Sequence, residues 1–158
     1  MSGTGKSTKF VAATGDSRID GLLHNRAWGD TQLTYRAPVA QSDYGPGYGS
    51  NEHLGLKQPT SLLMDAQRRY LDKQFGTAAN DGFSLEGFTS LTLTESSQSN
   101  AHLRVALTTS DPFSYGTAWG YFPSLGETGG DVWLSDVTYD FSNPRVGNYS
   151  NLTMIHEI

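Results

Sequence analysis

The sequence contains no cysteine among its 158 residues. This absence excludes a disulfide framework, a thiol nucleophile and any cysteine-ligated zinc or iron–sulfur centre. Charged residues are also scarce, at 17% of the chain, where a typical protein has about 25%. The 11 Lys and Arg are outnumbered by 16 Asp and Glu, which gives a formal net charge of −5 and argues against binding to nucleic acid. No apolar run approaches the roughly 18 residues of a membrane helix, so we expect no membrane span.

Glycine and aromatic residues are plentiful. The chain has 18 Gly, and its 7 Phe, 8 Tyr and 3 Trp provide enough apolar surface for a buried core. A length of 158 residues fits one domain that needs no covalent cross-links to be stable. This composition favours a loop-rich domain in which strands outweigh long charged helices.

The first 16 residues are small, polar and without periodic pattern, and we expect them to form an extended N-terminal arm that precedes a folded unit over 17–158. Within the arm, Gly5-Lys6-Ser7 resembles the end of a phosphate-binding loop, G-x-x-x-x-G-K-[ST]. The first glycine of that motif would lie before residue 1, and no strand precedes the loop to aim it at a phosphate. We therefore predict that the chain binds no nucleotide.

Alternation of apolar and polar residues predicts strands over 33–37 and 88–94. The more continuously apolar segment 103–107 predicts a central strand. Two further strands are expected over 117–122, which stops at Pro123, and over 131–134, which follows Gly129-Gly130. One helix is expected after Pro59, with Thr60 or Ser61 as its cap and Gly76 at its end. A second helix is expected over 151–158, capped by Ser150. These elements predict an α/β fold.

The second helix carries His156-Glu157, the first two residues of the zinc-binding pattern H-E-x-x-H. Histidines at i and i+4 project from one face of a helix, so both can bind one zinc ion. The glutamate between them can take a proton from a zinc-bound water molecule. Taken alone, the dipeptide has almost no specificity, and a surface histidine beside a glutamate is by far the more common case. We expect the motif to continue past Ile158 and the helix to be cut short there.

Further segments match one protease family in their order and spacing. They include Asp-Gly-Leu-Leu at 20–23 with Trp28, Leu-Thr-Tyr at 33–35 before Pro38, Ala66-Gln67, and Tyr-Gly-Thr-Ala at 115–118 leading to Pro123. Gly-Gly-Asp-Val-Trp-Leu at 129–134 and Thr-Met-Ile-His-Glu-Ile at 153–158 follow. With these segments, residues 17–158 resemble the N-terminal part of the serralysin-type secreted zinc metalloproteases, a branch of the metzincins.

The resemblance implies a mixed, mostly parallel, twisted sheet of five strands covered by two helices, the upper subdomain of a zincin-like catalytic domain. It implies that His156 is the first zinc ligand and that Glu157 is the general base of a metalloendopeptidase. It also implies that an antiparallel edge strand lines the cleft and binds an extended peptide substrate. The residues of that strand are Ala118, Trp119, Gly120 and Tyr121. Bacterial secretion to the extracellular space would follow.

The remaining zinc ligands, and the family's calcium-binding glycine-rich repeats, would lie beyond Ile158. A catalytic zinc site needs about three protein ligands, so we predict that this chain alone cleaves nothing. The alternative is a non-catalytic fragment, which binds a peptide or complements the missing C-terminal part supplied as a separate chain.

The other histidines stand singly in the sequence: His24, His53 and His102. None has ligand spacing to another histidine, and we assign each a structural or surface role. Asp131, Asp136 and Asp140 could suggest a calcium loop, but aspartate in loops more often stabilises turns.

Overall fold

The computed structural model describes residues 8–17, 26–44, 55–72, 84–109, 118–121, 130–137, 140–145 and 148–158. Within these residues, six strands form the main sheet: β3 (Gln32–Arg36), β4 (Leu56–Lys57), β5 (Thr92–Glu95), β6 (Leu103–Thr108), β7 (Ala118–Gly120) and β8 (Asp131–Ser135). Three α-helices accompany it: α2 (Ser61–Leu71), α4 (Leu85–Phe88) and α5 (Tyr149–Glu157). A short 3-10 helix covers Gln41–Asp43.

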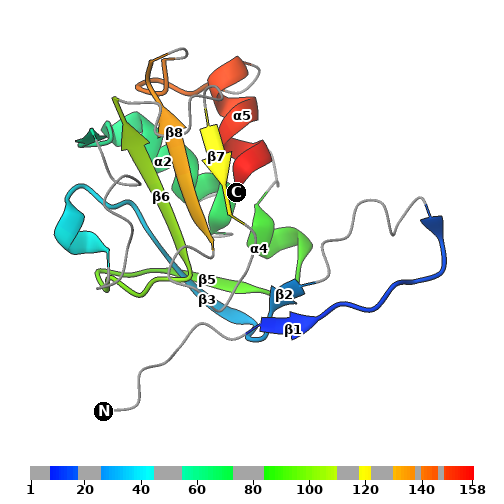
Figure 1. Ribbon diagram of the computed structural model, residues 1–158. Coiled ribbons are helices and arrows are strands. Elements are labelled where there is room, and N and C mark those ends of the chain that lie inside the picture. Colours follow the sequence, from blue (N-terminus) through cyan, green and yellow to red (C-terminus); the bar gives the residue numbers. More distant parts are fainter. Residues whose placement is uncertain are drawn as a thin grey trace.

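The main sheet has the strand order β5-β3-β6-β8-β7 (Figure 1). The pairs β5–β3, β3–β6 and β6–β8 are parallel, whereas β7 runs antiparallel to β8. Strand β4 runs antiparallel beside the end of β6, on the same edge that β3 occupies at the start of β6. The prediction of an α/β fold with a mixed, mostly parallel sheet is therefore confirmed, and the structure adds a sixth strand and a third helix.

A separate two-stranded sheet joins the N-terminal arm to the folded unit. Strand β1 (Thr8–Phe10) pairs antiparallel with β2 (Arg26–Trp28). Trp28 packs against the core of the main sheet, whereas the Phe10 side chain is 76% exposed. The phosphate-loop-like Gly5-Lys6-Ser7 lies outside the described residues.

Helix α2 begins where the sequence predicts. Thr60 is its N-cap, and the Thr60 side chain accepts a hydrogen bond from the Leu63 backbone N–H at 3.2 Å. The helix ends at Leu71, because Asp72 adopts an extended backbone conformation. It therefore ends before the predicted stop at Gly76, which lies outside the described residues.

The strand predicted over 88–94 is wrong in its first part. Ser84 caps α4 by accepting a hydrogen bond from the Gly87 backbone N–H at 3.0 Å, so Phe88 belongs to a helix and β5 starts at Thr92. The cap predicted for the second helix is also wrong. Asn148, and not Ser150, accepts the hydrogen bond from the Asn151 backbone N–H, at 2.9 Å. Asparagine is at least as good an N-cap as serine.

Helices α2 and α5 lie on the same side of the sheet (Figure 1). Their apolar side chains meet alternate residues of the central strands in a core of Leu63, Val105, Leu107, Val132, Leu134, Phe141 and Met154. A second core on this face consists of Leu33, Tyr35, Leu71, Leu93 and Leu103. Ile158 contacts both cores, so the end of α5 is packed into the domain.

Gly130 makes the turn that enters β8. Its φ of +80° is a backbone conformation that suits glycine, and a Cβ there would lie 2.1 Å from the His102 carbonyl oxygen. His102 in turn accepts a hydrogen bond at Nδ1 from the Thr34 backbone N–H at 3.1 Å, and its ring meets Trp28 edge to face. This histidine joins β3, β2 and the start of β6.

We expect Tyr35 to lower the free energy of unfolding at alkaline pH. Burial, followed by the nearby Glu95 carboxylate, raises the Tyr35 pKa from 10.0 to about 12. Because the fold favours the neutral phenol, the contribution of Tyr35 is complete below pH 10 and is lost as the pH rises towards 12. Among the described residues, its hydroxyl has no hydrogen-bond partner. We expect Tyr35→Phe to change the free energy of unfolding by less than about 1 kcal/mol at neutral pH and to weaken the alkaline loss.

Urea unfolding measured between pH 7 and pH 12 tests this expectation. The exposed Tyr149, replaced by phenylalanine, serves as the control and should leave the alkaline profile unchanged. An identical profile for wild type and Tyr35→Phe would contradict the assignment to Tyr35.

Candidate functional site

Strand β7 has an outer edge with which no described strand pairs, called the open edge below. It is the last strand of the main sheet within the described residues, and it pairs with β8 on one side. The Tyr121 backbone N–H donates to the Asp131 carbonyl at 2.8 Å, so the backbone groups of Tyr121 point towards β8. Backbone groups alternate in direction along such a strand, so those of Ala118 and Gly120 point away from β8. This edge can accept hydrogen bonds from, and donate them to, an added strand.

The last turn of α5 lies directly beside this strand. A Cβ added to Gly120 would lie 2.6 Å from the backbone carbonyl oxygen of Glu157 and 3.1 Å from its carboxylate Oε2. Glu157 can approach β7 so closely because residue 120 has no side chain. The structure thus brings together two of the sequence-predicted sites, the edge strand and the general base.

The two candidate residues of α5 have different surroundings. His156 is exposed and Glu157 is half-buried. Consecutive helical residues project about 100° apart, which allows Glu157 to face β7 while His156 faces solvent. The arrangement leaves the His156 imidazole accessible to a metal ion.

Trp119 and Tyr121 occupy the other face of the sheet. Their side chains alternate with Ala118, which packs into the core under α5, and with Gly120. The ring centroids of Trp119 and Tyr121 are 6.4 Å apart, and Tyr121 meets Trp133 edge to face at 5.5 Å. The four residues predicted to bind substrate are therefore divided between two faces.

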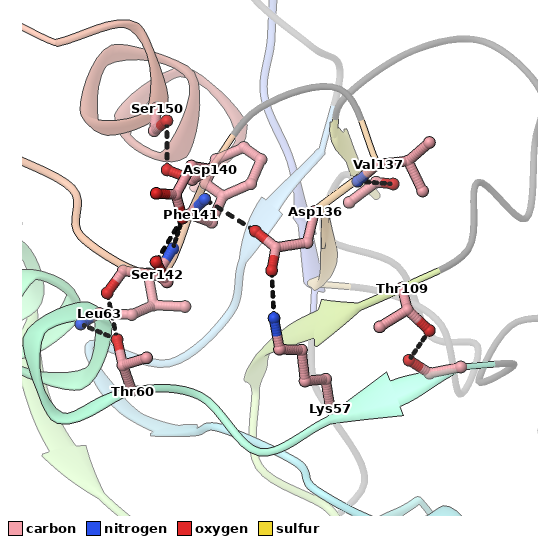
Figure 2. Close-up of polar contacts among 12 residues, drawn as sticks. Lys57, Thr60, Leu63, Thr109, Asp136, Val137, Asp140, Phe141, Ser142 and Ser150 are labelled. Atoms are coloured by element: carbon pink, nitrogen blue, oxygen red, sulfur yellow. Dashed lines mark hydrogen bonds and ion pairs between the residues drawn. The ribbon is translucent and has the colours of Figure 1, made fainter.

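The loop before α5 is fixed by Asp136. Figure 2 shows its carboxylate between two elements: one oxygen pairs with the Lys57 ammonium on β4, and the other accepts from the Phe141 backbone N–H at 2.9 Å. The Phe141 side chain is fully buried in the core below α5. Asp136 thus joins β4, the end of β8 and the loop that leads to α5.

A second set of contacts in this loop holds the start of α5 against α2. The Ser150 hydroxyl donates to the Asp140 carbonyl at 2.7 Å, and the Thr60 hydroxyl donates to the Ser142 carbonyl (Figure 2). The Ser142 hydroxyl and backbone N–H hold the Asp140 pKa below its ordinary value by hydrogen bonding to the carboxylate. The carboxylates of Asp136 and Asp140 therefore both form hydrogen bonds within the protein.

Sequence reasoning missed a buried ion pair behind the edge strand. Arg104 on β6 and Asp131 on β8 have fully buried side chains, and the guanidinium binds both carboxylate oxygens, with Nη2 to Oδ2 at 2.7 Å. Arg104 also donates to the Ser99 carbonyl at 3.0 Å and stacks over the Tyr44 ring. Since the Asp131 carbonyl accepts the bond from Tyr121, the pair supports the strand that carries the open edge.

No set of zinc ligands is complete in the described part of the chain, where no group of three or more histidine, aspartate or glutamate side chains could hold a metal ion. His24 and His53 lie outside that part. The predicted ligand His156 therefore belongs to no such group among the described residues. The described helices also include none with the length and apolarity needed to span a bilayer.

Comparison with known proteins gives no match, either to protein-family models or to curated proteins. The arrangement of α5 and β7 is thus the principal guide to function.

Proposed function

We propose that this chain forms the N-terminal part of the catalytic domain of a secreted, zinc-dependent metalloendopeptidase. The observation that carries the proposal is the contact between Glu157 and Gly120, which places a carboxylate beside an open strand edge. The exposed His156 precedes that carboxylate on the same helical turn. The sequence resemblance to serralysin-type proteases supports the same assignment.

The two elements have complementary tasks in peptide hydrolysis. An extended peptide can pair with the outward backbone groups of Ala118 and Gly120, which brings its main chain past the end of α5. Glu157 would take a proton from the attacking water and return it to the leaving amine as the peptide C–N bond breaks. A zinc ion, when bound, supplies Lewis-acid polarisation of the water and the carbonyl group.

His156 would be one of the protein ligands that hold this ion, and the chain offers a carboxylate and an imidazole of the appropriate type. A catalytic zinc has about three protein ligands, and the described residues contain no group of three that could supply them. We therefore expect the 158-residue chain alone to be inactive.

A second candidate function is peptide binding without catalysis. The observation in its favour is that the described residues include the open edge of β7 but no complete set of zinc ligands. In this case the chain would bind an extended peptide, or complement a separate C-terminal fragment, without hydrolysing either.

Metal analysis of the complete protein that contains this sequence tests the proposed function. We expect one zinc ion per molecule in the wild type and none retained by His156→Ala at the same free zinc concentration. His53→Ala, a histidine without ligand spacing to another, should retain the metal. Equal zinc content in wild type and His156→Ala would contradict the proposal.

A further inference from the structure

The two faces of the sheet differ chemically at the open edge of β7. On the face that carries α5, Gly120 offers no side chain and the Glu157 carboxylate lies against the strand. On the opposite face, Trp119 and Tyr121 stand side by side. Side chains of an added strand alternate between the same two faces, so a bound peptide meets both environments in turn.

The Trp119 and Tyr121 side chains pack against a buried aromatic residue of β8. Trp133 lies directly opposite Trp119 in the register of β7 and β8, and its side chain is buried. Tyr121 packs edge to face against both Trp119 and Trp133. This packing restricts the indole of Trp119, a residue that nevertheless remains 38% exposed. A large aromatic surface that is already ordered loses little conformational entropy when a ligand covers it.

We propose that Trp119 determines specificity, an inference that rests on the proposed function. The site selects extended peptides with an aromatic or large aliphatic side chain on the Trp119 face. Side chains directly opposite each other on neighbouring strands lie about 4.5–5.5 Å apart at Cβ, close enough for the indole to cover such a group. Tyr121 extends the same surface along the strand. On the Glu157 face, the carboxylate disfavours an acidic side chain by like-charge repulsion.

The magnitude follows from known aromatic pairs. The stabilisation from a contact between two aromatic side chains exceeds that expected from buried area alone. The excess corresponds to a roughly two- to tenfold preference in affinity. The backbone hydrogen bonds of the added strand are common to all peptides. Trp119 should therefore affect discrimination between peptides more than the ability to bind one.

Titration of the 158-residue chain with two blocked peptides, identical except for one central Phe or Ala, tests the inference without metal. Chemical shifts of the Ala118 and Gly120 amides report strand addition, and dissociation constants report preference. We expect the Phe peptide to bind roughly two- to tenfold more tightly to the wild type, and Trp119→Ala to remove this preference. Trp119→Tyr should retain it, as should Leu152→Ala, which removes an exposed apolar side chain from α5.

Unchanged discrimination in Trp119→Ala would overturn the inference, as would amides of Ala118 and Gly120 that do not respond to either peptide. The assay follows no cleavage and needs no zinc. A failure of the proposed hydrolysis therefore shows in the metal analysis, and a failure of the specificity assignment shows here.

Discussion

Replacement of Glu157 by glutamine is expected to lower kcat/KM for peptide hydrolysis by the complete protein by about 10²- to 10⁴-fold. The glutamine side chain has nearly the same shape as glutamate, so it can occupy the same space beside Gly120. It cannot take a proton from water, which is the task proposed for this carboxylate. The effect should fall on kcat, since the binding edge of β7 is unchanged.

Three measurements separate this chemical effect from structural damage. Zinc content, the midpoint of urea unfolding and the affinity for a blocked peptide should all match those of the wild type. Glu86→Gln, a substitution of the same kind in the first turn of α4, should keep full hydrolytic activity. Wild-type activity in Glu157→Gln would show that another group moves the proton.

Removal of the Asp131 carboxylate is expected to give the largest loss of stability, about 3–5 kcal/mol for Asp131→Ala. The substitution leaves the Arg104 guanidinium buried without its carboxylate partner, while its contacts with the Ser99 carbonyl and the Tyr44 ring remain. The cost arises mainly from this uncompensated charge. Urea unfolding of the 158-residue chain, followed by circular dichroism, measures it.

The double substitution Arg104→Met with Asp131→Leu provides the control. Because it removes both charges and retains apolar volume, it should recover most of the stability that Asp131→Ala loses. A double-mutant cycle then gives the coupling between the two side chains. If Asp131→Ala unfolds at the same urea concentration as the wild type, the pair contributes nothing and the expectation is wrong.

The parts of the fold predicted well are those set by local chemistry. Thr60 follows a proline and precedes an apolar stripe, so the start of α2 could be read from adjacent residues alone. The largely apolar segment 103–107 correctly predicted a central strand, since all residues of β6 are buried. Parallel central strands show such runs because both of their faces are covered.

The parts that were missed depend on distant partners. Strand β4 has two residues and exists because the end of β6 lies beside it, a pairing across some fifty positions. The Arg104–Asp131 pair depends on the parallel register of β6 and β8, which places the two residues opposite each other. Helix α4 could have been found, because Ser84 followed by Glu86 is typical of a helix start.

The candidate site could be predicted only in part. The His156-Glu157 motif was visible in the sequence, and the resemblance indicated an edge strand at Ala118–Tyr121. The sequence did not show that Gly120 is the position at which α5 touches that strand, because this contact depends on how β8 and the Asp136 loop orient both elements. Nor did it show that Trp119 would face away from the helix.

The open edge of β7 also has a consequence for the behaviour of the protein in concentrated solution. Unpaired strand edges are templates for association between copies of the same chain, and they are a common origin of aggregation. Here the strand has three residues and contains a glycine, which limits the ladder that a second copy could build. The net charge of −5 adds repulsion between copies. The shortness of the strand and the net charge thus both make self-assembly through this edge unfavourable.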